Sequence, residues 1–252
     1  MPPSLTTSTF GLASRSLPQP TQDGVEGELR LDRYRGVVIP MPFKYALADE
    51  GSYFTGQNPT PGTGTAHALT TAFSNTSALF SFFNKAQPGG KRIYLDHMRL
   101  IFTAVPATSL WEDFVVDLDA AGRAPTAGNQ TITGQNVNID DGTQSIANLQ
   151  AFSAAALTVP ASTTSTRRIA RFRVNTGQVI NGDSILVQFG ASDFTQPRSA
   201  LAVVRATDVG QINGNAPPVV IGPQAYGTIY RWSAGEATTA PSFEFELGWW
   251  ER

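Results

Sequence analysis

The chain has 252 residues, 41% of them hydrophobic, which is enough for one large all-β domain or two small ones. Only 15% are charged, whereas globular proteins average roughly 25%. The net charge of −2 leaves no excess of Lys or Arg to neutralise phosphates, so we expect no direct nucleic-acid partner. Cysteine is absent, which excludes disulfides, thiolate nucleophiles and Cys-based zinc sites.

We expect neither an export signal nor a membrane span. The first residues include no basic region followed by an apolar one, so the sequence predicts no secretory signal peptide and synthesis in the cytoplasm. No apolar run approaches the roughly 18 residues of a membrane span, so we expect no membrane association. Surfaces this poor in charge occur where a protein contacts other subunits, and also in secreted β-proteins.

Residues 1–28 differ in composition from the rest of the chain, and we expect the globular domain over residues 29–252. The segment is rich in Pro, Ser and Thr and shows neither helical nor strand periodicity. Such a segment is either a disordered tail or an extended arm held by a partner. We interpret it as an arm that docks on a neighbouring subunit, with four candidate contact residues: Phe10, Leu12, Arg15 and Leu17.

The first half of the globular part contains two clear strands. A short apolar run at residues 35–40 ends at prolines, and residues 51–65 are expected to form a loop. Residues 69–83 favour a helix slightly over a strand. After a turn at Pro88-Gly89-Gly90, residues 91–105 form a strand with apolar side chains on both faces, and residues 111–118 form the next.

The second half repeats this pattern of short strands and turns. Strands are expected at residues 131–139, 167–175, 184–190, 201–206 and 225–232, and a loop at 210–222. Residues 144–157 fit a short helix as well as a strand. Turns are expected at Asp140-Asp141-Gly142 and Asn181-Gly182. The last strand, residues 242–252, alternates strictly, with one apolar face made of Phe243, Phe245, Leu247 and Trp249.

About nine or ten short strands with Gly and Pro turns predict an all-β fold. We expect an antiparallel β-sandwich, jelly-roll-like, with an extended N-terminal arm and at most one or two short helices.

The sequence gives little support for catalysis. Gly182-Asp183-Ser184 resembles the nucleophile block of GDS-type esterases, but that block lies near the N-terminus and is followed by a C-terminal histidine. Here the two histidines, His67 and His97, precede it. An Asn-Gly turn before a strand explains the same residues. We therefore expect a non-enzymatic protein without a cofactor.

Carboxylates suggest two further sites that we do not favour. Glu244 and Glu246 share a strand face and would suit a glycosidase pair with each other or with Asp117 and Asp119; a solvated or interface-facing strand explains them as well. The stretch from Asp117 to Gly122 begins like a calcium loop but lacks later ligands. A different calcium site with Asp140 or Asp141 stays open, and we predict no metal.

The preferred candidates are interface residues. Arg168, Arg171 and Arg173 lie in one strand and suit phosphate, sugar acids or a carboxylate-bearing partner, although a plain charged sheet face explains them too. We favour salt bridges between subunits. Trp250 points away from Trp249 and is expected to anchor an interface, with Glu244 and Glu246 on the same face.

The chain resembles virion proteins of tailed bacteriophages, in particular capsid cement or decoration proteins. The resemblance rests on the Pro/Ser/Thr arm, the uncharged Thr/Gly/Ala stretches, the lack of Cys, and the strand Lys91-Arg92-Ile93-Tyr94-Leu95-Asp96-His97-Met98-Arg99-Leu100. It implies a non-enzymatic virion protein, made in the host cytoplasm, that joins neighbouring subunits of the major capsid protein and is itself a homo-oligomer. The alternatives are a receptor- or carbohydrate-binding β-module of a phage tail or fibre, a secreted lectin, and a jelly-roll capsid shell protein.

Overall fold

The computed structural model describes residues 43–105, 111–120, 123–175, 180–190, 211–233 and 239–252. The chain divides into two units, residues 1–46 and 47–252, and every described strand belongs to the second. The one described helix, α1 (Phe43–Asp49), is too short to cross a membrane. The arm predicted for residues 1–28 and the strands predicted at 35–40 and 201–206 lie outside the described residues.

The larger sheet has eight strands, of which six form a continuous path. In spatial order these are β13 (Gln211–Ala216), β12 (Ser184–Phe189), β5 (Ile93–Ala104), β16 (Ser242–Glu251), β1 (Tyr53–Gln57) and β8 (Gln135–Asn136). Two short strands join it from the side: β14 (Val220–Ile221) pairs with β5, and β2 (Thr65–Ala66) pairs with β16. All these pairs are antiparallel except β12 with β13.

The second sheet has six strands, all paired antiparallel. Their order is β11 (Arg167–Asn175), β6 (Trp111–Asp119), β15 (Tyr226–Trp232), β4 (Phe80–Asn84), β9 (Ala147–Phe152) and β7 (Asn129–Ile132). A separate small ladder joins β3 (Ser77–Ala78) to β10 (Leu157–Thr158).

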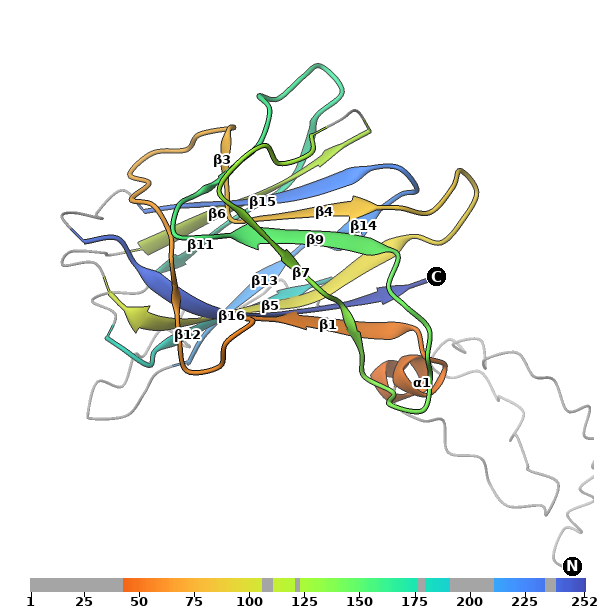
Figure 1. Ribbon diagram of the computed structural model, residues 1–252. Helices are drawn as coiled ribbons and strands as arrows, with labels where there is room; N and C mark the ends of the chain where they lie inside the picture. Colours follow the sequence, from red (N-terminus) through yellow and green to blue (C-terminus); the bar gives the residue numbers. More distant parts are fainter. Residues whose placement is uncertain (1–42, 106–110, 121–122, 176–179, 191–210, 234–238) are drawn as a thin grey trace, which may run out of the picture. The chain divides into compact units, whose positions relative to one another are not determined.

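The two sheets pack face to face as two layers (Figure 1), and aromatic side chains fill the space between them. Phe80 of β4 meets Phe245 of β16 with ring centroids 5.1 Å apart, and Phe82 meets Trp249 at 5.7 Å. All four side chains are buried. Burying one phenylalanine contributes about 1.5–3 kcal/mol. The predicted all-β antiparallel sandwich is confirmed.

Eight strands of the two sheets pair in a nested order. The first, β1, pairs with the last, β16; β4 pairs with β15; β5 pairs with β12; and β6 pairs with β11. The first and third of these pairs lie in the larger sheet and the other two in the smaller one. Of the remaining strands, β7, β8, β9 and β13 extend the two sheets at their edges, and the short strands β2, β3, β10 and β14 form additional small pairs.

The last strand lies inside the larger sheet, between β5 and β1. The predicted inward residues are all buried in the core, as expected: Phe243, Phe245, Leu247 and Trp249. Glu244, Glu246 and Trp250 face outward and are only partly buried. The strict alternation of this segment is therefore explained by one core face and one outer face.

A β-bulge explains the mixed apolar parity of β5. His97 lies opposite Gly248, but the next pair is Leu95 with Trp249, so β5 carries one extra residue. Ile93 and Leu95 before the bulge, and Met98 after it, therefore all reach the core. The expectation of two covered apolar faces is corrected: residues of both parities turn to one face.

Several predicted elements were wrong in type. Strand β1 lies in the predicted loop 51–65, where Gly56 brings the backbone close to the core: an added Cβ would lie 2.8 Å from Leu149. Strands β3 and β4 replace the predicted helix of residues 69–83, and β13 and β14 lie in the predicted loop 210–222. Pairing with neighbouring strands, which local sequence does not report, decides each case.

Other predictions are settled in finer detail. The strands expected near residues 91–105, 111–118, 167–175, 184–190, 225–232 and 242–252 are confirmed, and residues 144–157 contain strand β9 and the first residue of β10. Alternation across residues 131–139 was misleading, because Ile132 is buried but Ile139 is 96% exposed. The described chain holds sixteen strands, more than expected, since several are only two residues long.

Candidate interaction surfaces

Two ion pairs join β6 and β11 on the outward face of the six-stranded sheet. Arg173 donates from Nε and Nη2 to the two oxygens of Asp113, at 2.8 and 2.9 Å, and Arg168 binds Asp117 in the same way at 3.0 and 3.3 Å. The arginine side chains are 54% and 47% exposed, but both aspartates are only 1% exposed. The carboxylates therefore lie beneath the guanidinium groups, and these pairs present positive groups to solvent.

A β-bulge brings all three predicted arginines to this face. Simple alternation would turn Arg168 away from Arg171 and Arg173, but the pairing of β11 with β6 shifts by one residue between Arg168 and Ala170. The guanidinium of Arg171 lies 6.0 Å from the ring centroid of Trp232. No carboxylate among the described residues pairs with it. We call Arg168, Arg171 and Arg173 the arginine row.

A second apolar cluster lies against the same sheet face, beside the arginine row. Phe73 packs edge-on against Tyr230 and Trp232, at 5.5 and 5.4 Å between ring centroids. The guanidinium of Arg168 lies 4.4 Å from the Phe73 ring centroid, within the range of a cation–π contact. Strands β3 and β10 contribute Ala78 and Leu157 to this cluster. Residues 73–78 and 157–159 thus cover part of the outward face of the six-stranded sheet, and the arginine row lies at the edge of the covered part.

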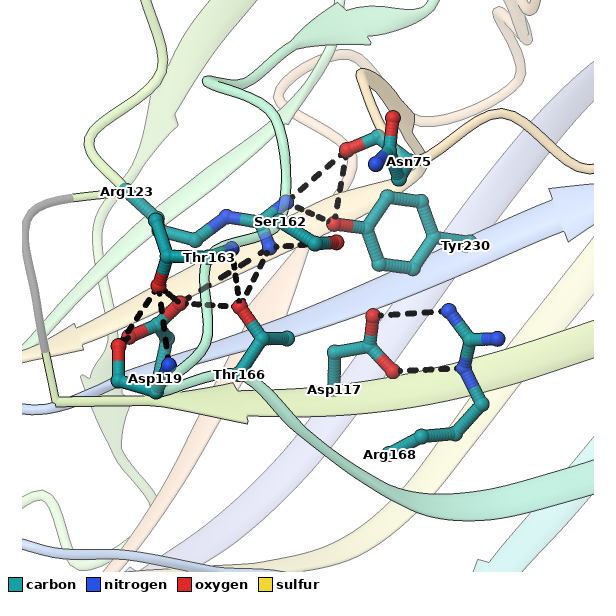
Figure 2. A network of polar contacts seen from close by, with 10 residues as sticks. Asn75, Asp117, Asp119, Arg123, Ser162, Thr163, Thr166, Arg168 and Tyr230 are labelled. Carbon is teal, nitrogen blue, oxygen red and sulfur yellow. Dashed lines mark hydrogen bonds and ion pairs between the residues drawn. The ribbon is translucent and has the colours of Figure 1, made fainter.

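A buried polar network fixes the loops around this cluster (Figure 2). Asp119 accepts hydrogen bonds from Ser165 Oγ at 2.6 Å and Thr166 Oγ1 at 2.5 Å. Arg123, which is 1% exposed, donates to the hydroxyl oxygen of Tyr230 and to the Asn75 carbonyl. Burial raises the pKa of Tyr230 to about 12, so its hydroxyl stays protonated. The network joins four separate segments, around residue 75, residues 119 and 123, residues 165–166 and residue 230, and serves to hold them in place.

The outward face of the eight-stranded sheet carries a different polar cluster. Tyr53 Oη donates to Asp96 Oδ2 at 2.6 Å, and the same oxygen lies 3.1 Å from His97 Nδ1. His97 Nε2 lies 3.4 Å from Glu246 Oε1. Burial and the hydrogen bond to Asp96 raise the pKa of Tyr53. The Tyr53 side chain crosses Gly248, where an added Cβ would lie 2.7 Å from its oxygen.

Trp250 lies beside this cluster. Its ring is parallel to that of Tyr94 within 3°, with centroids 5.7 Å apart, and the two residues are register partners in β16 and β5. Both are partly buried. The predicted opposite orientation of Trp249 and Trp250 is confirmed, because Trp249 is fully buried in the core.

The other histidine is structural. His67 is fully buried, its Nδ1 lies 2.9 Å from the Ala68 carbonyl oxygen, and its ring meets Phe152 edge-on. Burial, together with the positive charge of Arg231, lowers its pKa to about 3. His67 is therefore neutral at physiological pH.

The esterase-like residues form a turn. Gly182 has a φ of +92°, and Asp183 accepts a hydrogen bond from the Ile180 N–H at 2.9 Å. Ser184 is buried at the start of β12. The predicted Asn-Gly turn before a strand is confirmed and accounts for these residues.

The structure separates Glu244 and Glu246 from Asp117 and Asp119, while the two glutamates share one face of β16 as predicted. Glu244 and Glu246 face outward from the larger sheet, whereas Asp117 and Asp119 face outward from the smaller one. Asp141 Oδ1 accepts a hydrogen bond from the Thr143 N–H at 2.7 Å. Within the described ranges, no group of three or more His, Asp or Glu side chains is arranged to hold a metal ion.

Sequence reasoning located the arginine row but missed the two polar clusters. The sequence did carry a signal for the network of Asp119 and Arg123. Only 15% of the residues in the chain are charged, yet five charged residues lie between Glu112 and Arg123. No local pattern links Tyr53 to His97. The predicted arm contacts Phe10, Leu12, Arg15 and Leu17 lie outside the described residues.

Comparison of the chain with protein-family models, with curated proteins and with solved structures gave no match.

Proposed function

We propose that the protein is a non-enzymatic virion structural protein, a capsid cement or decoration protein that bridges neighbouring coat subunits. The observation that carries the proposal is the nested pairing of eight strands, first with last and so inward to β6 with β11. We interpret this order as a jelly roll, with β2, β3, β7–β10, β13 and β14 as additions. Jelly rolls recur in viral capsid proteins and in lectins.

The outer faces support a role in protein contacts. The charged fraction of 15% is low, and paired aspartates are covered by arginines on one face. A surface of this kind costs less to desolvate than one rich in isolated charges. The arm of residues 1–28 would extend the contact onto a neighbour and add binding through a second attachment point.

The test is immunogold electron microscopy of virus particles from cells that carry the gene, with an antibody raised against the full chain. We expect label distributed over the capsid shell. Label confined to the tail would overturn the cement assignment. So would mass spectrometry of purified particles that detects none of this protein. Closed particles formed by the protein expressed alone would identify a shell protein instead.

The arm has its own test on the same particles. A variant lacking residues 1–25 should occupy fewer sites per particle than the full chain. Equal occupancy would remove the arm from the proposal, while the shell label would still support the sandwich as the bridging part.

Carbohydrate binding is the second candidate, because the parallel Tyr94–Trp250 pair lies on the same outer sheet face as His97 and Glu246. Aromatic rings stack on sugars, and adjacent carboxylates accept their hydroxyl hydrogen bonds. A glycan array probed with the full chain tests it. Binding that Trp250→Ala abolishes would favour a receptor-binding module over a cement protein.

A further inference from the structure

We propose that the arginine row (Arg168, Arg171 and Arg173) binds an extended acidic segment of a neighbouring protein subunit, with Arg171 taking a carboxylate of that segment. The inference rests on the proposed function for the identity of the neighbour, but the binding chemistry follows from the row itself.

The row presents guanidinium groups while hiding the carboxylates that hold them. Asp113 and Asp117 are 1% exposed, whereas about half of each paired arginine side chain reaches solvent. Three guanidinium groups and two carboxylates leave one net positive charge in the row. That charge belongs to Arg171, which has no carboxylate partner among the described residues.

Two of the three guanidinium groups, those of Arg168 and Arg173, are held in place before a partner arrives. Arg168 is fixed by two hydrogen bonds to Asp117 and by the ring of Phe73. Arg173 is fixed by two hydrogen bonds to Asp113. Preorganised side chains lose little rotamer freedom on binding, so more of the interaction energy appears as affinity.

The space between Arg171 and Arg173 suits a carboxylate. A shallow hollow of about 350 Å³ is lined there by Asp113, Arg171, Phe172 and Arg173. A guanidinium fork matches a planar carboxylate through two parallel hydrogen bonds. Because Asp113 forms part of the lining, the hollow disfavours a dianionic phosphate more strongly than a single carboxylate.

The spacing of the row points to an extended partner. Arg171 and Arg173 are two residues apart in a strand, so their side chains leave the face about 6.6 Å apart. Alternate side chains of another extended chain have the same spacing. A segment with acidic residues at alternate positions therefore aligns its carboxylates with Arg171 and Arg173.

The experiment measures fluorescence anisotropy with the full chain and three labelled probes: a (Glu-Thr)4 peptide, the matching (Gln-Thr)4 peptide and an eight-nucleotide oligothymidylate. We expect binding of the Glu-Thr peptide only. Arg171→Ala should weaken it about tenfold or more, because a charged hydrogen-bonding partner is lost. Arg171→Lys should restore little, since a lysine keeps the charge but not the fork.

Arg167→Ala is the matched control, because it removes the same charge one residue outside the row. Equal weakening by Arg167→Ala and Arg171→Ala would overturn the proposal in favour of nonspecific attraction. Absence of Glu-Thr binding, or stronger oligothymidylate binding, would also overturn it. Unchanged circular dichroism of each variant verifies folding. Since the assay uses no virus particle, it fails or succeeds independently of the immunogold test.

Discussion

Glu112 and Arg231 form an ion pair inside the sandwich. Arg231 Nε lies 2.7 Å from Glu112 Oε2, Nη2 donates to Oε1 at 2.8 Å, and both side chains are 0% exposed. The pair joins β6 to β15, and the guanidinium lies 5.1 Å from the ring centroid of Phe243 in the opposite sheet. Charges this deep are tolerated only while each has its partner.

Removing one partner of this pair should destabilise the protein strongly. Arg231→Met leaves the Glu112 carboxylate buried without its partner, and we expect the free energy of unfolding to fall by about 3–5 kcal/mol. Urea denaturation followed by tryptophan fluorescence measures it. The double variant Glu112→Leu, Arg231→Met should recover most of the loss. As a control, Arg252→Met breaks the exposed pair with Glu50 and should cost less than about 1 kcal/mol. A similar cost for the two single variants would contradict the prediction.

His67 should make stability depend on pH. Its pKa is about 3 in the folded protein and about 6.5 when unfolded, so the unfolded chain binds more protons between these values. The stabilisation is complete above pH 6.5 and is lost as the pH falls. Between pH 7 and pH 5 the wild type should lose about 2 kcal/mol more than His67→Gln. Urea midpoints at both values test it, with His97→Gln as the matched variant, and equal losses in wild type and His67→Gln would refute the assignment.

A glycine at position 248 should be needed to leave room for the side chains of Tyr53 and His97, which lie over it. A Cβ at this position would lie 2.3 Å from His97 Cε1 and 2.7 Å from Tyr53 Oη, so Gly248→Ala should destabilise by about 1–3 kcal/mol. Adding His97→Ala should recover part of that loss, which a double-mutant cycle measures. Gly142→Ala is the control, because nothing lies within 4 Å of its added Cβ. Additive effects of Gly248→Ala and His97→Ala would show that the clash is not with the histidine.

Asp119 should hold the loop before β11 in place. Asp119→Ala removes the acceptor of the Ser165 and Thr166 hydroxyl groups, and we expect a loss of about 1–3 kcal/mol. Amide hydrogen exchange of residues 160–166 should rise several-fold relative to the rest of the sheet. Ser162→Ala removes a single hydrogen bond from Arg123 and should change exchange much less. Uniform faster exchange across the sandwich would mean global destabilisation and not local release.

The sequence by itself determined the fold class and the core face of the last strand. Alternation from Phe243 to Trp249 has a period that only a half-buried strand satisfies, and turn residues such as Asn181-Gly182 act through their own backbone preferences. Both signals are local, so they can be read from the sequence without knowing which strands pair. The same holds for the strand that carries the arginine row.

Only the tertiary structure decided which residues meet. Bulges in β5 and β11 arise from pairing with β16 and β6, and they set the face of His97 and of Arg168. Gly56, which lies in β1 within the predicted loop, is required by its approach to Leu149 in the other sheet. Nested pairing joins residues up to the full length of the domain apart, so register and contacts follow from how the two sheets pack and not from any one segment.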